Sequence, residues 1–299
     1  MRSCSPSICL LPRTALSNEA RALLGNPEAA ALLADEGFAG PRVGFILGSG
    51  WGHFIDHART IQSRSYADIP GFGVSTVPGH AGCLVRGSVR GREFLAMQGR
   101  LHVYEGYPLA QVAGPVALLE ELGVRTLIVT NAAGGIDPAL QVGDLVRVRD
   151  FIHFMLESPL RGAQQSVAAP SGLSERLGAL AEEAARNAKI PLKSGVLFTS
   201  KGPTYETPAE VRMAQRLGAD LVSMSTTPEL IAAGALGIEA VAFSCVTNMA
   251  PGIIPGRAVR HEEVIEVMNA SRERCAALLA AVLEKLEQRS PGASAALEA

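Results

Sequence analysis

Short runs of apolar, often β-branched residues alternate along this chain with longer segments in which apolar residues recur every three or four positions. The short runs predict buried strands, and the longer segments predict amphipathic helices. The expected strands are 43–47, 82–89, 92–99, 126–133, 144–152, 192–200, 222–225 and 240–248, and the expected helices are 109–122, 173–187, 208–217, 228–236 and 262–288. The second and third strands are expected to pair as a hairpin.

This alternation predicts an α/β fold in which helices flank both faces of a central mixed sheet. The sequence has no Pro/Ser-rich linker and no internal repeat, so we expect one domain over 18–288. Residues 1–17 and 289–299 are expected to be loose terminal extensions. In folds of this class, ligands bind at the carboxyl ends of strands. The polar and Gly-rich segments that follow several expected strands are therefore the first candidates for a site.

Composition narrows the range of partners. Of the 299 residues, 47% are hydrophobic, and the formal net charge is -2, with no block of Lys and Arg that could follow a nucleic-acid backbone. The five cysteines are scattered and form no CxxC pair, which favours reduced thiols in the cytoplasm over disulfides or a zinc site. The most apolar stretch, 231–254, is interrupted by Glu239, Asn248 and Pro251. This stretch predicts buried protein and not a membrane span. From the charge distribution and the cysteine spacing, we expect no nucleic-acid partner and no metal.

Two segments that follow expected strands carry groups suited to an anion. In LGSGWG (47–52), small residues let backbone N–H groups converge, and the Ser49 hydroxyl is a further donor. The segment GRLHVYEGYP (99–108) contains Arg100, whose guanidinium fits an oxyanion, together with His102 and Tyr104. Taken alone, the first segment is equally consistent with an ordinary glycine turn, and the second with a solvated polar loop.

Two later segments are candidates for contact with a planar ligand. The small residues of TNAAGGID (130–137) leave the backbone open to close approach, although a tightly packed crossover would use the same residues. In SKGPTYETPAEVRM (200–213), Thr207 and Glu210 are expected to cap the following helix. Glu206 precedes the cap and has no such role, so its carboxylate is either a ligand contact or a solvated loop residue.

The last candidates lie near the C-terminal end of the chain. Asn248 ends an otherwise apolar strand, where its amide needs partners, either a ligand or the following turn. Met224 and Ser225 end another strand, and Thr227 is expected to cap the helix after them. His261 opens the final helix, a position where a lone histidine is more often solvated than bound to a ligand.

In chain order, these segments resemble the purine nucleoside phosphorylases of the trimeric type that acts on 6-oxopurine nucleosides. The resemblance spans about residue 41 to residue 285 and is carried by LGSGWG (47–52), PGHAG (78–82), GRLHVYEGYP (99–108), TNAAGG (130–135), PLRG (159–162), GPTYETPAE (202–210), GADLVSMSTTPE (218–229), TNMAPG (247–252) and HEEV (261–264). It implies a single-domain three-layer sandwich and a homotrimer. It also implies a pentosyltransferase that splits inosine or guanosine reversibly into free base and α-ribose 1-phosphate, with inorganic phosphate as co-substrate and no cofactor.

The resemblance further implies roles for individual residues. The expected phosphate ligands are Ser49, His80, Arg100, His102, Ser225 and the backbone N–H of Ala132. The expected ribose contacts are Tyr104, Met224 and His261, and the expected base site is Tyr205, Glu206, Asn248, Gly134 and Val222. Asn248, Glu206 and His102 correspond to the catalytic groups. A donor to purine N7 at Asn248 and an acceptor of N1–H at Glu206 predict inosine and guanosine over adenosine.

Three features depart from the family pattern. The segment 150–159 is shorter than usual and lacks the Gly-rich loop that supplies an aromatic residue to the neighbouring subunit's site, so Phe151, Phe154 or neither takes that part. Ser223 stands where the family commonly has Gly, and Thr227 where it has Val. The alternatives to the main reading are a phosphorylase that prefers xanthosine or methylthio-nucleosides, and a non-catalytic purine-binding relative.

Overall fold

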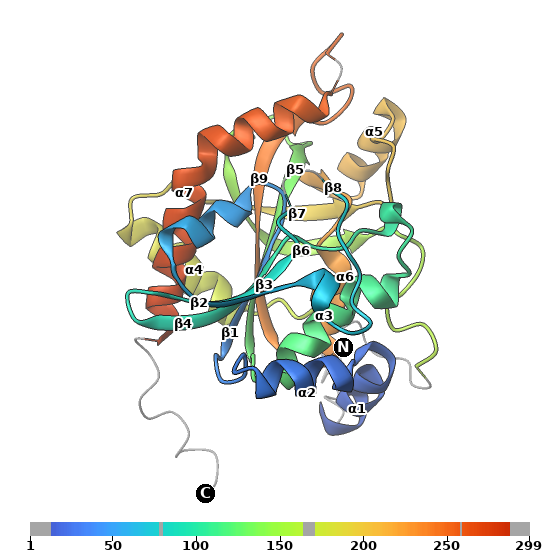
Figure 1. Cartoon of the computed structure of the whole chain (residues 1–299). Helices are drawn as coiled ribbons and strands as arrows, with labels where there is room; N and C mark the ends of the chain where they lie inside the picture. Colours follow the sequence, from blue (N-terminus) through green and yellow to red (C-terminus); the bar gives the residue numbers. More distant parts are fainter. Residues whose placement is uncertain (1–12, 78–79, 164–170, 258, 288–299) are drawn as a thin grey trace, which may run out of the picture.

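A nine-stranded mixed sheet with helices on both faces forms the centre of the molecule (Figure 1). The computed structural model describes residues 13–77, 80–163, 171–257 and 259–287. The strands are β1 (Val43–Leu47), β2 (Arg59–Ser65), β3 (Cys83–Val89), β4 (Arg92–Gln98), β5 (Thr126–Gly135), β6 (Leu145–His153), β7 (Lys193–Thr199), β8 (Leu221–Ser223) and β9 (Glu239–Met249). Their order is β2-β3-β4-β1-β5-β8-β7-β6-β9. The expected α/β architecture is confirmed.

Pairing between β5 and β9 closes part of the sheet on itself. β5 runs parallel to β9 along its whole length and also pairs antiparallel with β8 through Gly134 and Gly135. Since β8 pairs with β7, β7 with β6, and β6 with β9, these strands form a closed ring. The ring brings the ends of β5, β8 and β9 together, and the sequence did not predict it.

The helices form two layers, each with its own apolar core. On one side of the sheet lie α1 (Arg13–Leu24), α2 (Pro27–Asp35), α3 (Leu109–Glu121) and α6 (Thr227–Ala235). On the other side lie the 3-10 segment η1 (Trp51–His57), α4 (Glu175–Asn187) and the long α7 (His261–Glu287). A third, smaller core joins α5 (Pro208–Arg216) to β7 and β8 through Phe198, Val211 and Val222.

Local signals explain several helix boundaries. The Thr207 hydroxyl accepts from the backbone N–H of Glu210 at the start of α5, and the Glu210 carboxylate accepts from the backbone N–H of Thr207, so the expected capping box is confirmed. Asn26 caps α2 in the same way, with its side-chain oxygen accepting from Ala29 N, and Pro27 is the first residue of the helix.

Three details differ from the sequence-based expectation. The edge strand β2 was not expected, because most of its residues are exposed and it shows no apolar alternation. Thr227 does not cap α6: the cap position is Thr226, and the Thr227 hydroxyl is buried 2.8 Å from both His153 Nδ1 and Thr199 Oγ1. Helix α1 begins at Arg13, before the boundary placed at residue 18.

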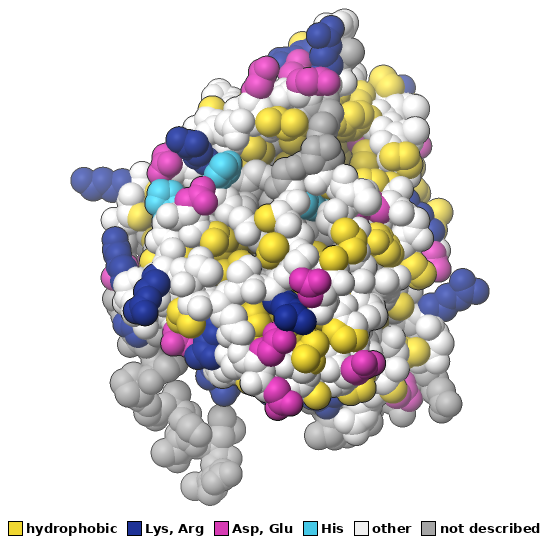
Figure 2. Space-filling view, viewed as in Figure 1, with side chains coloured by type: hydrophobic (Ala, Val, Ile, Leu, Met, Phe, Trp, Pro, Cys, Tyr) yellow, Lys and Arg dark blue, Asp and Glu magenta, His cyan; other side chains and the backbone are white. Residues whose placement is uncertain are grey.

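The surface carries charges of both signs. On the face shown in Figure 2, Lys and Arg side chains are interspersed with Asp and Glu, and neither sign gathers into a continuous patch. Among the helices of the described residues, none is both long and apolar enough to cross a bilayer.

Candidate active site

A cavity of about 500 Å³ lies where the ends of β1, β5, β8 and β9 meet the loops that follow β4 and β7. Most of the residues singled out from the sequence line it: Ser49, Arg100, His102, Tyr104, Ala132, Gly134, Tyr205, Glu206, Val222, Met224, Ser225 and Asn248. Ser49 and Asn248, which are almost two hundred residues apart in the chain, therefore face one space. Below, the part around Ser49, Arg100 and Ser225 is called the anion end, and the part around Glu206 and Asn248 is called the base end.

Of the other expected site residues, His80 does not line the cavity. His80 lies directly behind it, with Nε2 3.3 Å from Ser49 Oγ and its ring stacked on that of His102 at a centroid distance of 5.4 Å. His261 is the first residue of α7, but its side chain lies outside the described part of the structure. Residues 78–79 of the PGHAG motif also lie outside it.

The turn after β1 is fixed against the neighbouring strand β5. Gly48 N donates to Thr130 Oγ1 at 3.1 Å, and the Trp51 indole N–H donates to the carbonyl of Asn131 at 2.9 Å. A side chain at Gly48 would not fit, because an added Cβ would lie 2.6 Å from the carbonyl oxygen of Thr130. This close approach explains the glycine and holds Ser49 at the cavity wall.

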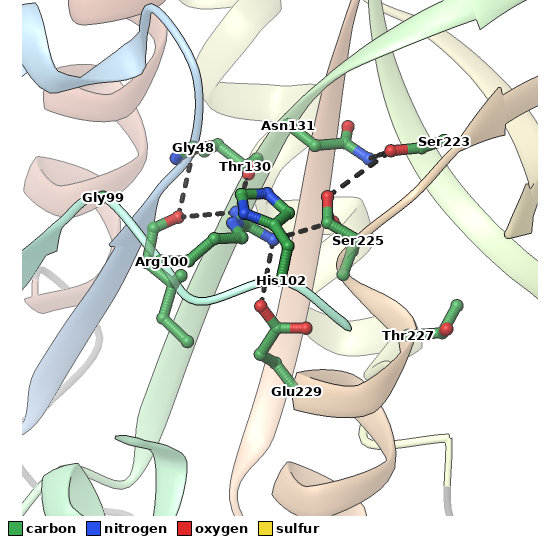
Figure 3. A network of polar contacts seen from close by, with 12 residues as sticks. Gly48, Gly99, Arg100, His102, Thr130, Asn131, Ser223, Ser225, Thr227 and Glu229 are labelled. Carbon is green, nitrogen blue, oxygen red and sulfur yellow. Dashed lines mark hydrogen bonds and ion pairs between the residues drawn. The ribbon is translucent and has the colours of Figure 1, made fainter. Parts of the chain in front are cut away.

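Arg100 is buried in the floor of the anion end and is held by groups from distant elements (Figure 3). Its Nη1 donates to Glu229 Oε1 at 3.0 Å and to Thr226 Oγ1 at 3.1 Å, and its Nη2 donates to the Thr130 carbonyl. Both Arg100 and Glu229 have side chains at most 2% exposed. Burial lowers the pKa of Arg100, and the charge of Glu229 opposes that shift. Glu229 therefore balances the charge of the guanidinium and fixes it beside the cavity, and Arg100 Nε is left as a buried N–H without a partner among the described residues.

Thr226 has an unusual backbone conformation. Its φ is 84°, a region that β-branched residues rarely adopt. This conformation lies between Ser225, which lines the cavity, and the start of α6. The hydrogen bond from Arg100 to the Thr226 hydroxyl helps to hold this strained conformation. The guanidinium at the anion end therefore also fixes the residue next to Ser225.

Three aromatic rings stack beside the cavity: His102 and Tyr104 line it, and His80 lies behind them. His102 lies between His80 and Tyr104, with centroid distances of 5.4 and 4.6 Å. Burial lowers the pKa of His80 to about 4 and also lowers the pKa of His102. Both rings are therefore neutral at pH 7 in the unliganded protein.

Glu105 sets the orientation of His102. One carboxylate oxygen accepts from His102 N at 2.8 Å and lies 2.9 Å from His102 Nδ1, and the other accepts from the backbone and hydroxyl of Thr76. Burial pushes the pKa of Glu105 upward, but the hydrogen bonds from His102 and Thr76 outweigh it and lower that pKa to about 2. An ionised acceptor at Nδ1 places the ring proton there and leaves Nε2 as the other polar atom of the ring.

A short series of hydrogen bonds links β5 to the Ser225 turn (Figure 3). Asn131 Nδ2 donates to Ser223 Oγ at 3.1 Å, and Ser223 Oγ lies 3.4 Å from Ser225 Oγ and 3.3 Å from the carbonyl oxygen of Ala132. Because Asn131 occupies one lone pair of Ser223, the single Ser223 proton is available to Ala132 or to Ser225. When it goes to Ser225, the proton of Ser225 is left for Thr226 Oγ1, 3.4 Å away, or for a ligand.

The base end is built from shorter-range contacts. Glu206 is 7% exposed, and its Oε1 accepts from the Ser200 hydroxyl at 2.8 Å. The capping box uses Thr207 and Glu210 and leaves Glu206 to the cavity, as its position in the sequence indicated. Tyr205, 40% exposed, lies at the rim.

Asn248 has both a local role and a place in the cavity wall. Thr247 Oγ1 donates to Asn248 Oδ1 at 3.0 Å, and Asn248 Nδ2 donates to the carbonyl of Met249 at 3.2 Å. An amide nitrogen carries two protons, so one can serve the following turn while the other serves a ligand. Gly134 packs against this amide: an added Cβ would lie 2.9 Å from Val222 Cγ2 and 3.3 Å from Asn248 Nδ2.

The shortened segment before Pro159 contributes no aromatic ring to this chain's own cavity. Phe151 packs against the apolar core, and Phe154 lies with its ring centroid 5.1 Å from that of Phe198. Phe154 is 37% exposed, and neither phenylalanine lines the cavity.

Sequence reasoning missed several residues that organise the site. They are Glu229, Thr226, Asn131 and Ser200, whose contacts are all described above. Glu229 follows Pro228 at the start of a helix, where an acidic residue is ordinarily explained by the helix dipole, and only its burial distinguishes it. Among the described residues, no group of three or more His, Cys, Asp or Glu side chains could hold a metal ion.

Comparison with known proteins identifies relatives of this chain. Residues 42–284 match the family model described as the phosphorylase superfamily. The chain is 42% identical over 253 residues to "Purine nucleoside phosphorylase 1" of Bacillus subtilis (strain 168), covering 83% of this chain and 93% of that protein. It is similar to a schistosoma purine nucleoside phosphorylase in complex with hypoxanthine, with a TM-score of 0.80, 33% identity, and coverage of 87% of this chain and 96% of the other. It is also similar to the Schistosoma mansoni enzyme in complex with adenosine, with a TM-score of 0.81, 34% identity and the same coverage.

Proposed function

The chain belongs to the phosphorylase superfamily and, within it, to the purine nucleoside phosphorylases, and from this premise we propose that it splits 6-oxopurine nucleosides, inosine and guanosine, with inorganic phosphate. The products are the free base and α-ribose 1-phosphate, and the deoxyribosides react in the same way. The observation that carries this proposal is the shared cavity, which has an arginine-backed anion end and an amide and a carboxylate at the base end.

Phosphate is the proposed nucleophile. It binds at the anion end, where Ser49, Ser225 and the backbone N–H of Ala132 supply donors beside the buried Arg100 guanidinium. His102, whose ring proton is held on Nδ1 by Glu105, presents Nε2 to accept from the hydroxyl of a protonated phosphate, and the His80 ring completes the set behind Ser49. An oxygen of phosphate forms a bond to C1′ of the ribose as the C1′–N9 bond breaks. The bound anion also faces the positive charge that develops on the sugar, so the protein needs no nucleophile of its own.

The departing purine takes the electrons of the broken bond. Negative charge grows at N7, where Asn248 Nδ2 donates a hydrogen bond, and the Thr247 hydroxyl on Oδ1 keeps the amide in the orientation that presents this donor. Tyr104, Met224 and His261 position the ribose. Tyr205, Gly134 and Val222 confine the base. One preorganised donor of this kind is typically worth about 3 kcal/mol of the barrier.

Glu206 is the proposed selector for 6-oxopurines. Its carboxylate accepts the N1–H of hypoxanthine or guanine, whereas adenine has a lone pair at N1. A site built on a hydrogen bond rejects an analogue that lacks the partner by up to about 10⁴-fold. The complex of the related schistosomal enzyme with adenosine shows binding in that protein, so turnover of adenosine is the quantity to measure here.

We also propose a cytoplasmic homotrimer without a bound cofactor or metal. The family resemblance supports the trimer, and the unpaired, reduced Cys83, Cys245 and Cys275 fit a reducing compartment. The phosphate anion stabilises the positive charge that develops on the ribose, and Asn248 stabilises the negative charge that develops on the purine. The chemistry therefore requires no further group.

A single assay tests the function. Purified protein is incubated with inosine, with and without inorganic phosphate, and hypoxanthine and ribose 1-phosphate are measured. We expect phosphate-dependent release of both products, with guanosine active and adenosine at least about 100-fold slower. Release of base without phosphate would indicate a hydrolase, and binding of inosine without release would indicate a purine-binding protein. The variant Glu206→Gln is expected to lose most of the preference for inosine over adenosine.

A further inference from the structure

Ser200 forms the hydrogen bond that orients the base-end carboxylate. Its hydroxyl donates to Glu206 Oε1 at 2.8 Å, and an ionised carboxylate can only accept, so the direction of this bond is fixed. Ser200 itself is anchored, because its backbone N–H donates to the carbonyl of Ser223 at 3.0 Å. The next residue, Lys201, forms an ion pair with Glu157 at 2.9 Å. The hydroxyl therefore lies at the start of the loop that carries Glu206, where the backbone bond to Ser223 at the end of β8 fixes the position of Ser200.

Ser200 does not line the cavity, whereas Glu206 does. The serine therefore reaches a ligand only through the carboxylate. The serine hydroxyl bonds to Oε1. Among the described residues, Oε2 has no hydrogen-bond partner, and this oxygen is not fully buried. The two oxygens of the carboxylate thus have different surroundings before any base binds.

We propose that Ser200 positions the Glu206 carboxylate and thereby determines specificity. Because of this residue, the site accepts hypoxanthine, which has no 2-amino group, in addition to guanine, which has one. This inference rests on the proposed function, since it concerns the same base-binding carboxylate. The N1–C2 edge of guanine offers two donors, N1–H and the 2-amino group, and these match the two oxygens of a carboxylate. Hypoxanthine offers N1–H alone.

The Ser200 hydroxyl supplies the donor that hypoxanthine lacks. With inosine bound, Oε2 accepts from N1–H and Oε1 accepts from Ser200, so neither oxygen of the nearly buried carboxylate is left without a partner. With guanosine bound, Oε1 accepts from the 2-amino group in addition. Without the serine hydroxyl, the inosine complex contains a buried, unpartnered oxygen, and the guanosine complex does not.

The test compares kcat/KM for inosine and guanosine in Ser200→Ala and in the unaltered protein. We expect the guanosine-to-inosine ratio to rise roughly tenfold, the scale set by one buried acceptor left unpaired, mainly through a loss with inosine. Ser200→Thr keeps a hydroxyl and should restore the ratio. Ser200→Cys keeps the size with a weaker donor and should give an intermediate ratio, which also serves if the alanine variant does not fold.

Ser194→Ala is the matched control. Ser194 lies on β7, the strand that Ser200 directly follows; it is exposed, and its hydroxyl accepts from Arg147 Nη2 at 3.2 Å, away from the cavity. It should leave the ratio unchanged. If Ser200→Ala slows both nucleosides by the same factor, Ser200 only supports the loop and the inference is wrong. If the unaltered protein splits neither nucleoside, the proposed function fails, which is a different result.

Discussion

The anion end and the base end of the cavity are stabilised over very different distances in the sequence. Arg100 bonds to Thr226 and Glu229, which are 126 and 129 residues away, and Asn131 bonds to Ser223 across 92 residues. At the base end, Glu206 is held by Ser200, six residues before it, and Asn248 by the adjacent Thr247. The polar side chains of the anion end are therefore held by partners far away in the sequence, whereas those of the base end are oriented by partners close to them in the sequence.

This difference fits the two tasks. Every substrate of a phosphorylase brings the same phosphate, so a rigid, preorganised anion site serves all of them. The base differs from one nucleoside to another, and a site held by local contacts can change its selectivity without disturbing the fold. If this account is right, substitutions at the anion end should affect stability, and those at the base end should affect selectivity or rate.

The largest expected effect is on stability, from Glu229→Ala. This variant leaves the buried guanidinium of Arg100 without its counter-charge, and breaking a buried ion pair in this way typically costs about 3–5 kcal/mol. We expect the free energy of unfolding, measured by urea denaturation, to fall by that amount. If the free energy of unfolding falls by less than about 1 kcal/mol, the buried ion pair at the anion end does not make a large contribution to the stability of the fold.

Glu206→Ala is the matched test at the base end. It removes a carboxylate whose hydrogen bond within the protein is the one from Ser200, so the free energy of unfolding should change by less than about 1 kcal/mol. Phosphorolysis of inosine should nevertheless be almost abolished. If both glutamate variants unfold equally easily, the contrast between the two ends is wrong.

Asn248→Ala should have the next largest effect, and on rate alone. The lost donor to N7 acts in the transition state, so kcat should fall by roughly 10²–10³ while KM for inosine changes little. Steady-state kinetics with saturating phosphate measure both quantities. Thr247→Val keeps the side-chain shape but removes the hydroxyl on Asn248 Oδ1, and it should cause a smaller fall of about tenfold. A rise in KM without a fall in kcat would refute the transition-state role.

Acid should weaken the anion end through His80. The pKa of His80 is about 4 in the folded protein, below its ordinary value of 6.5, so the unfolded chain binds more protons between these values. The free energy of unfolding therefore falls as pH is lowered through this window, by up to about 2 kcal/mol between about pH 7.5 and pH 5. Glu105, whose pKa is about 2, acts separately, since its contribution is lost only below about pH 4.5.

Urea denaturation at the two pH values tests this expectation. His80→Asn removes the titrating ring and should reduce the difference in unfolding free energy between them. His57→Asn is the control, because His57 is an exposed histidine whose Nε2 pairs with Glu273 on the surface. An unchanged pH dependence in His80→Asn would show that other groups cause the acid sensitivity.

The same contrast between local and distant contacts separates the elements that could be predicted from the sequence from those that could not. The strands β1 and β5 and the cap of α5 were predictable because an apolar run, or Thr207 with Glu210, carries its signal within a few residues. The ring closed by β5 and β9 was not, since a buried strand reads as apolar whatever its partner. The edge strand β2 gave no apolar signal because most of its residues are exposed.

The candidate site shows the same limit. Glu206 was singled out because its neighbours Thr207 and Glu210 account for the cap without it, and the structure places it in the cavity wall. Glu229 gave no signal, because its partner Arg100 is 129 residues away and a glutamate in the first turn of a helix needs no other explanation. Thr227 was misassigned for a related reason: its contacts, His153 and Thr199, come from other strands.

The smallest expected effect concerns Ser223→Gly, which introduces the glycine that the family resemblance leads us to expect at this position. Ser223 accepts from Asn131 and lies 3.4 Å from Ser225 Oγ, so its loss removes one link between β5 and the Ser225 turn. Because Arg100 and the Gly48 turn remain, we expect KM for phosphate to rise by only about threefold, with KM for inosine unchanged. Steady-state kinetics with varied phosphate at saturating inosine measure the change.

The variant Ser223→Ala distinguishes an effect of the lost hydroxyl from an effect of the backbone. Alanine removes the same hydrogen bonds but keeps the β-carbon, so both variants should raise KM for phosphate alike if the hydroxyl matters. If only the glycine variant is affected, the cause is the freedom of the backbone after β8. If the inosine KM rises in place of the phosphate KM, then Ser223 serves the base end, and the boundary between the two ends lies on the other side of this residue.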